Sequence, residues 1–124
     1  MTWLKMINQK PKTIICDIDG TLIKHCGDIT KQVDSKELLP GVLDFWKKID
    51  RDGCRIILIT GRRESLREKT IIVLNELGIF YDELIMGLPS GTRVLINDLK
   101  PSGDKPTALA INVERNKGLE GVEI

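Results

Sequence analysis

An apolar run that ends in two acidic residues is the feature that most constrains how this chain folds. Residues 13–18 are mostly β-branched or aliphatic, and Asp17, Asp19 and Gly20 stand where the run ends. Such a run is typical of a buried strand, and in an open α/β sheet ligands bind at the carboxyl ends of the strands. The sequence therefore predicts that the chemistry of this protein lies at the end of its first strand.

The spacing of the two acids suits a bound cation. Side chains alternate along a strand with a period of two, so Asp17 and Asp19 face the same side if the strand persists. Mg²⁺ usually takes one or two carboxylates and keeps several waters, which makes it the expected ion. On this segment alone, Asp19-Gly20 also fits the turn of a β-hairpin. A helix-loop-helix calcium loop is excluded, because its required glycine falls on Leu22.

Length and charge narrow the class of protein. The chain has 124 residues, which predicts one domain over residues 1–124. Its 19 basic and 18 acidic residues give a formal net charge of +1. The chain therefore has no large excess of positive charge that would attract nucleic acid or a membrane surface, which argues against both as partners.

Cysteine usage and hydropathy point to the cytoplasm. Cys16, Cys26 and Cys54 are odd in number and form no closely spaced pair, which argues against a disulfide framework and a zinc site. Residues 1–12 lack a sustained apolar region, and no segment approaches the ~20 apolar residues of a membrane span.

Strand-like and helical patterns alternate along the chain. Helical spacing of apolar residues occurs over residues 42–49 and 66–77. We therefore expect an α/β fold with a mainly parallel five-stranded sheet. The connection over residues 99–106 is too short for a parallel crossover, so the last strand is expected to be antiparallel, at an edge. The predicted strands are residues 13–18, 55–59, 83–86, 93–96 and 107–113.

Three of these strands end in polar residues. Asp17 and Asp19 follow the first, Thr60 and Gly61 the second, and Asp98 the fourth. Three such endings favour one shared pocket over three separate turns.

The motifs DIDGT at residues 17–21, ITGR at 59–62 and IND at 96–98 resemble, in order and spacing, those of the haloacid dehalogenase superfamily of aspartate-based phosphohydrolases. The resemblance covers about residues 13–98. It implies a Rossmann-like three-layer domain, a Mg²⁺ cofactor and an aspartyl-phosphate intermediate. The aspartate at position 19 resembles phosphatases and phosphomutases rather than dehalogenases.

The resemblance also implies roles for individual residues. Asp17 resembles the nucleophile, and Asp19 the general acid and base, whose backbone carbonyl is a metal ligand. Thr60 resembles the hydroxyl that holds the phosphoryl oxygens, assisted by the amide of Gly61. Asp98 resembles the carboxylate that completes the Mg²⁺ site with Asp17 and Asp19.

The basic residue of the site is less clearly marked. Arg93 is the interpretation for the cation that neutralises the phosphate, and Gly20 is expected to contact the same group. Alternatives are that Arg93 is an exposed residue at the start of a strand, or that Lys100 or Arg62 is the cation. Asn97 stands where the family usually has a second acid, so the metal site carries one charge less.

The loop over residues 24–36 resembles a flap-like hairpin, in which His25 either contacts a leaving group or is a solvated loop residue. Neither gap between the motifs can hold a cap domain, so the chain resembles capless members. Resemblance to phosphatases of sugar acids and capsule biosynthesis implies a small phosphorylated sugar, enclosed by a neighbouring subunit of a homo-oligomer. Alternatives are a non-catalytic subunit that binds phosphate and Mg²⁺, and a phosphatase of nucleic-acid ends or phosphoproteins.

Overall fold

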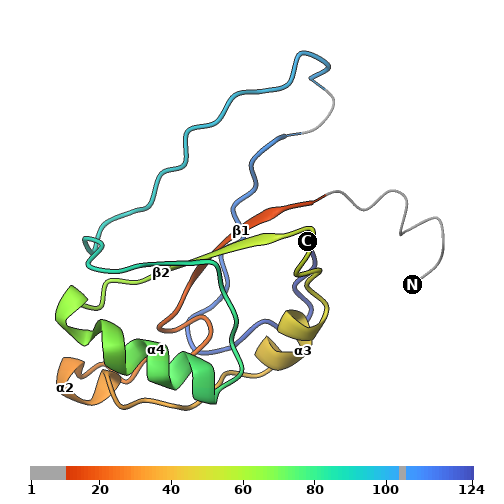
Figure 1. Ribbon diagram of the computed structural model, residues 1–124. Coiled ribbons are helices and arrows are strands. Elements are labelled where there is room, and N and C mark those ends of the chain that lie inside the picture. Colours follow the sequence, from red (N-terminus) through yellow and green to blue (C-terminus); the bar gives the residue numbers. More distant parts are fainter. Residues whose placement is uncertain (1–10, 104–105) are drawn as a thin grey trace.

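The computed structural model describes residues 11–103 and 106–124 and has a small parallel sheet at its centre (Figure 1). The strands are β1 (Thr13–Asp17), β2 (Arg55–Ile59) and β3 (Glu83–Ile85), in the order β1-β2-β3. Both pairings are parallel. The α/β class and the parallel sheet predicted from the sequence are confirmed.

The helices all lie on one side of this sheet (Figure 1). They are α2 (Ile29–Gln32), α3 (Val42–Lys47) and α4 (Arg67–Glu76), and a 3₁₀ turn, η1 (Glu64–Leu66), precedes α4. Crossovers between parallel strands are right-handed, and both crossovers here step in the same direction across the sheet, which places α3 and α4 on the same face. In the part of the chain described, the predicted three layers are therefore two.

The core lies between this helical layer and the covered face of the sheet. Leu58 of β2 stands in register with Leu84 of β3, and both are buried. Trp46 of α3 is 1% exposed, and its indole N–H donates to the carbonyl of Phe80 at 2.9 Å. On the uncovered face Ile15 is 49% exposed.

The fourth and fifth strands predicted from the sequence are not formed in the structure, so the five-stranded sheet stays a prediction. Residues 93–96 and 107–113 contain no strand. Residues 88–103 run away from the sheet, and residues 106–113 run back toward it (Figure 1). Val94 is 76% and Ile96 91% exposed. A strand exists only as part of a hydrogen-bonded ladder. Neither segment forms one with β1, whose second edge is unpaired among the described residues.

In place of the predicted hairpin over residues 24–36, the structure has a short helix between two residues that form an isolated bridge. Ile23 and Leu38 form an antiparallel bridge, and α2 lies between them. Asp28 caps α2, because its carboxylate accepts from the amide of Thr30 at 2.9 Å.

The C-terminal segment is hydrogen-bonded to the loop after β1 and to the segment before α3. The amide of Asn116 donates to the carbonyl of Gly20 at 2.9 Å, and the amide of Leu119 donates to that of Pro40 at 2.9 Å. Gly118 has a φ of +84°, and a Cβ there would collide with the backbone of Pro40, so the contact requires glycine. These contacts hold together residues that are 96 and 79 positions apart in the sequence.

No helix in the described ranges is long and apolar enough to cross a membrane. The cytoplasmic location was predicted partly from the lack of a sustained apolar region in residues 1–12. Most of that segment, residues 1–10, lies outside the described residues.

Replacing Trp46 with alanine should destabilise the fold strongly, because it empties a fully buried site and leaves the carbonyl of Phe80 unpaired. We expect a loss of about 3–5 kcal/mol in the free energy of unfolding, measured by urea denaturation with circular dichroism. Leu43→Ala is the control, since Leu43 is on the same helix but 41% exposed. Equal losses for the two variants would contradict this account of the core.

Candidate active site

The polar residues at the ends of β1 and β2 line one cleft of about 720 Å³. Asp17, Asp19, Thr60 and Gly61 all contribute to it. They gather because the carboxyl ends of neighbouring parallel strands meet at the same edge of a sheet. Two of the three predicted strand ends, those of β1 and β2, therefore share one pocket. Asp19 and Gly20 do not form the turn of a β-hairpin, because the bridge between Asp19 and Ile23 is parallel.

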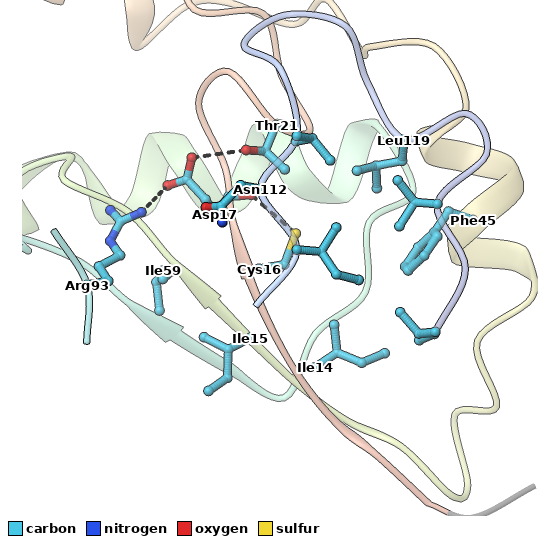
Figure 2. A pocket seen from close by; sticks show the side chains of 14 residues that line it. Ile14, Ile15, Cys16, Asp17, Thr21, Phe45, Ile59, Arg93, Asn112 and Leu119 are labelled. Carbon is cyan, nitrogen blue, oxygen red and sulfur yellow. Dashed lines mark hydrogen bonds and ion pairs between the residues drawn. The ribbon is translucent and has the colours of Figure 1, made fainter. Parts of the chain in front are cut away.

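Asp17 is held between a cation and a hydroxyl. Arg93 donates from Nη1 to Oδ1 at 2.9 Å, and the Thr21 hydroxyl donates to Oδ2 at 3.2 Å. Figure 2 shows the two partners on opposite sides of the carboxylate, at the end of an apolar groove of about 350 Å³ along β1. The side chains of Asp17 and Arg93 are 30% and 43% exposed. Both remain accessible to a ligand.

Asp19 is held more firmly, by a buried arginine. Arg62 donates from Nε to Oδ2 at 2.9 Å and from Nη2 to Oδ1 at 2.8 Å, a two-point ion pair. The side chains are 4% and 15% exposed. The remaining donors of Arg62 reach the Thr70 hydroxyl at 3.2 Å and the carbonyl of Gln32 at 3.2 Å. Arg62 thus ties the end of β1 to α2 and α4.

Gln32 completes the surroundings of Asp19. Its Nε2 donates to Oδ1 of Asp19 at 2.8 Å and to the carbonyl of Lys24 at 2.9 Å, while its Oε1 accepts from the amide of Cys26 at 2.6 Å. Gln32 is buried although it lies on a four-residue helix. No pattern in the sequence marks it, because its role depends on contacts across a loop.

Thr60 and Gly61 occupy the end of β2. Thr60 is 1% exposed, and its hydroxyl lies 3.4 Å from Oδ2 of Asp19 and accepts from the amide of Arg62 at 3.1 Å. The amide of Gly61 donates no hydrogen bond to any described residue. That N–H is a donor available to an anion in the cleft.

Asp98 is not brought to the cleft. It is exposed, and its backbone carbonyl accepts from the Thr107 hydroxyl, which also accepts from Asn97 at 2.7 Å. Among the described residues no three acidic, histidine or cysteine side chains gather as a metal site. The acidic part of the cleft consists of Asp17 and Asp19.

His25 and Arg115 line the mouth of the cleft. The His25 ring accepts through Nδ1 from the amide of Gly27 at 3.0 Å. Its backbone N–H donates to Asn116 Oδ1 at 2.7 Å, and its carbonyl accepts from Asn116 Nδ2 at 3.0 Å. Sequence reasoning missed Arg115, because it follows Asp17 by almost the whole length of the domain and belongs to no motif.

Cys16 lies beside Asp17, and its thiol is expected to be unreactive at neutral pH. Burial raises the pKa of the Cys16 thiol to about 12, and the neighbouring Asp17 carboxylate adds to the rise. The thiolate is the reactive form, so it becomes populated only as the pH approaches that value.

We therefore predict that iodoacetamide at pH 8 modifies Cys26, which is exposed, well before Cys16. Peptide mass spectrometry over a time course measures both rates in the same sample. Modification of Cys16 as fast as Cys26 would show that its thiol is not shielded in this way.

Removing Arg62 should leave a buried, unpaired carboxylate. Arg62→Met is expected to lower the free energy of unfolding by about 3 kcal/mol or more, and by clearly less in an Asp19→Asn background. Arg55→Met is the control, because Arg55 forms an exposed ion pair with Glu83 at 3.0 Å and should cost less than about 1 kcal/mol. An equal cost of Arg62→Met in both backgrounds would contradict the coupling.

Known proteins match both the motifs and the fold. Residues 11–90 match the family of the polynucleotide kinase PNKP phosphatase domain. Among solved structures, a chain of the Pnkp1/Rnl/Hen1 complex is 31% identical, with a TM-score of 0.53, over 70% of this chain and 31% of that chain. A chain of the Pnkp1/Rnl/Hen1 RNA repair complex is 30% identical, with a TM-score of 0.52, over 69% of this chain and 29% of that chain.

The D,D-heptose 1.7-bisphosphate phosphatase from B. bronchiseptica, complexed with magnesium and phosphate, is 19% identical, with a TM-score of 0.44, over 60% of this chain and 49% of that chain. No curated protein matches. This chain spans only about a third of the length of the two repair-complex chains.

These matches correct the expectation, drawn from net charge, that nucleic acid is not a partner, since the family is that of a polynucleotide kinase and one neighbour is part of an RNA repair complex. The physical reason is that net charge averages over the whole surface. The cleft is lined by four arginines and three aspartates, and Arg93 and Arg62 are paired with Asp17 and Asp19. The two arginines that form no ion pair among the described residues, Arg63 and Arg115, leave positive charge available there. The strand-end carboxylates and the match over residues 11–90 together place the chain in the polynucleotide kinase PNKP phosphatase domain family of the haloacid dehalogenase superfamily.

Proposed function

We propose that this protein is a Mg²⁺-dependent phosphatase that removes a terminal phosphate from a nucleic-acid end, with Asp17 as the nucleophile. The observation that carries the proposal is the arrangement of Asp17: an accessible carboxylate at the end of β1, bonded to Arg93 and beside a second, firmly held carboxylate. Membership of the PNKP phosphatase domain family supports the reaction class and the kind of substrate.

Asp17 is suited to attack phosphorus. Carboxylates are ionised at neutral pH and need no activating base. An oxygen of Asp17 bonds to phosphorus while the bond from phosphorus to the leaving oxygen breaks, giving an aspartyl-phosphate and an alcohol. Water then attacks the same phosphorus, which releases inorganic phosphate and restores the carboxylate. Arg93 contacts Asp17 at the place where the negative charge of the phosphoryl group would lie.

Asp19 is positioned for proton transfer in the same cleft. The two N–H donors of Arg62 orient the Asp19 carboxylate, which would give a proton to the leaving oxygen in the first step and accept one from the attacking water in the second. Thr60, close to Asp19, and the N–H of Gly61 support the proposed phosphate contacts. Gly20 does not support the contact predicted for it, because it is buried, does not line the cleft and donates its N–H to the carbonyl of Ile23 at 2.7 Å.

The donor set at the end of β1 fits Mg²⁺. The carboxylate of Asp17 and the backbone carbonyl of Asp19 are oxygen ligands, and that carbonyl accepts no hydrogen bond from the described residues. A bound Mg²⁺ would neutralise charge on the transferring phosphoryl group. The proposal includes Asp98 as a further ligand, which requires residues 93–98 to lie along the unpaired edge of β1 as the fourth strand of a five-stranded sheet.

The test is phosphate release from a panel of substrates. We expect wild-type protein in Mg²⁺ to act on DNA or RNA oligonucleotides with a 3′- or 5′-phosphate, and Asp17→Asn to be slower by ~10³-fold or more. Chelation with EDTA should reduce activity similarly, and added Mg²⁺ should restore it. Asp44→Asn is the matched control, because Asp44 is exposed on α3 and does not line the cleft.

Two results would overturn the proposal at different levels. A wild type no faster than Asp17→Asn on every substrate would remove the enzymatic function and favour a subunit that only binds phosphate. Release from sugar phosphates in the same panel, with none from oligonucleotides, would keep the reaction and reject the nucleic-acid substrate.

A further inference from the structure

Arg115 is placed at the cleft by the C-terminal segment, outside the residues that match the family. Its Cγ lies 3.3 Å, and its Nε 3.8 Å, from the position that a Cβ on Gly20 would occupy. The side chain therefore packs against the glycine of the loop after β1, which also carries Asp19. A larger residue at position 20 would push Arg115 away from this place.

The segment around Arg115 is built to hold this position. Asn116 has a φ of +64°, which non-glycine residues seldom adopt. In that conformation its side chain bonds both backbone groups of His25, and its own amide bonds the carbonyl of Gly20. Three hydrogen bonds thus fix the residue next to Arg115 against the loop that follows β1.

The guanidinium of Arg115 has no partner among residues 11–103 and 106–124. It makes no hydrogen bond or ion pair with any residue in the part of the chain described, and it is exposed. Arg62 and Arg93, in contrast, are each bonded to an aspartate of the site. Arg115 therefore offers a cation that neither carboxylate uses.

We infer that Arg115 binds the phosphodiester next to the terminal nucleotide of the substrate. The inference rests on the proposed function and adds a residue that determines specificity. The terminal phosphate is assigned to Arg93 and the metal at Asp17, so a further cation at the mouth of the cleft suits a second anion. Arginine binds phosphate oxygens through paired N–H groups. An oligonucleotide end carries such a second anion, whereas a simple sugar phosphate does not.

Pairs of substrates that differ only in this second anion provide the test. A dinucleotide with a terminal phosphate is compared with its analogue that has an uncharged methylphosphonate linkage, in both DNA and RNA form. Wild-type protein should prefer the charged linkage by about tenfold in kcat/KM, chiefly through KM. Arg115→Ala should abolish that preference, and Arg115→Lys should retain part of it.

Lys117→Ala is the matched control, because it removes an exposed positive charge two residues away that does not line the cleft. It should keep the full preference for the charged linkage. Arg115→Ala with an unchanged preference, in a wild type that does hydrolyse oligonucleotide ends, would overturn this inference alone. A wild type that hydrolyses neither dinucleotide overturns the proposed function and this inference with it, which separates the two failures.

Discussion

The ion pair between Arg62 and Asp19 is the interaction on which the site depends. A buried charge is costly unless it is paired and hydrogen-bonded, and here every described contact of the guanidinium leads to a different element. Asp19 comes from the loop after β1, Thr70 from α4, and the Gln32 carbonyl from α2. One cation therefore fixes the ends of two strands and the helices beside them, which keeps Asp19 close to Thr60.

The sequence predicts the part of the site that follows from sheet geometry. Apolar runs mark β1 and β2, and parallel strands bring their carboxyl ends together, so the meeting of Asp17, Asp19 and Thr60 could be expected from the sequence alone. Asp98 was assigned by the same reasoning, and it depends on a ladder beside β1 that the described residues do not form. An apolar pattern indicates that a strand is favourable but does not show which edge it pairs with.

Contacts between distant loops could not be predicted. Asn116 and His25 are 91 positions apart, and Gln32 reaches Asp19 across a turn of irregular backbone. Such contacts depend on the exact path of loops, which carry no periodic pattern. The net charge was misleading for a related reason, because a total of +1 does not show that two arginines outside the described ion pairs, Arg63 and Arg115, line the cleft. The distribution of charge, which governs local attraction, appears only once the chain is folded.

The Arg93–Asp17 and Arg62–Asp19 ion pairs differ in burial, and this difference bears on which arginine is the better candidate to bind the phosphate. Arg93 and Asp17 are partly exposed, so water can replace either partner and their separation costs little. Arg62 and Asp19 are almost enclosed, and separating them would leave charges without solvent. An incoming phosphate can therefore take over Arg93, whereas it would have to break the buried network to take over Arg62. This difference favours Arg93 over Arg62 as the phosphate-binding cation and leaves Arg62 to position Asp19.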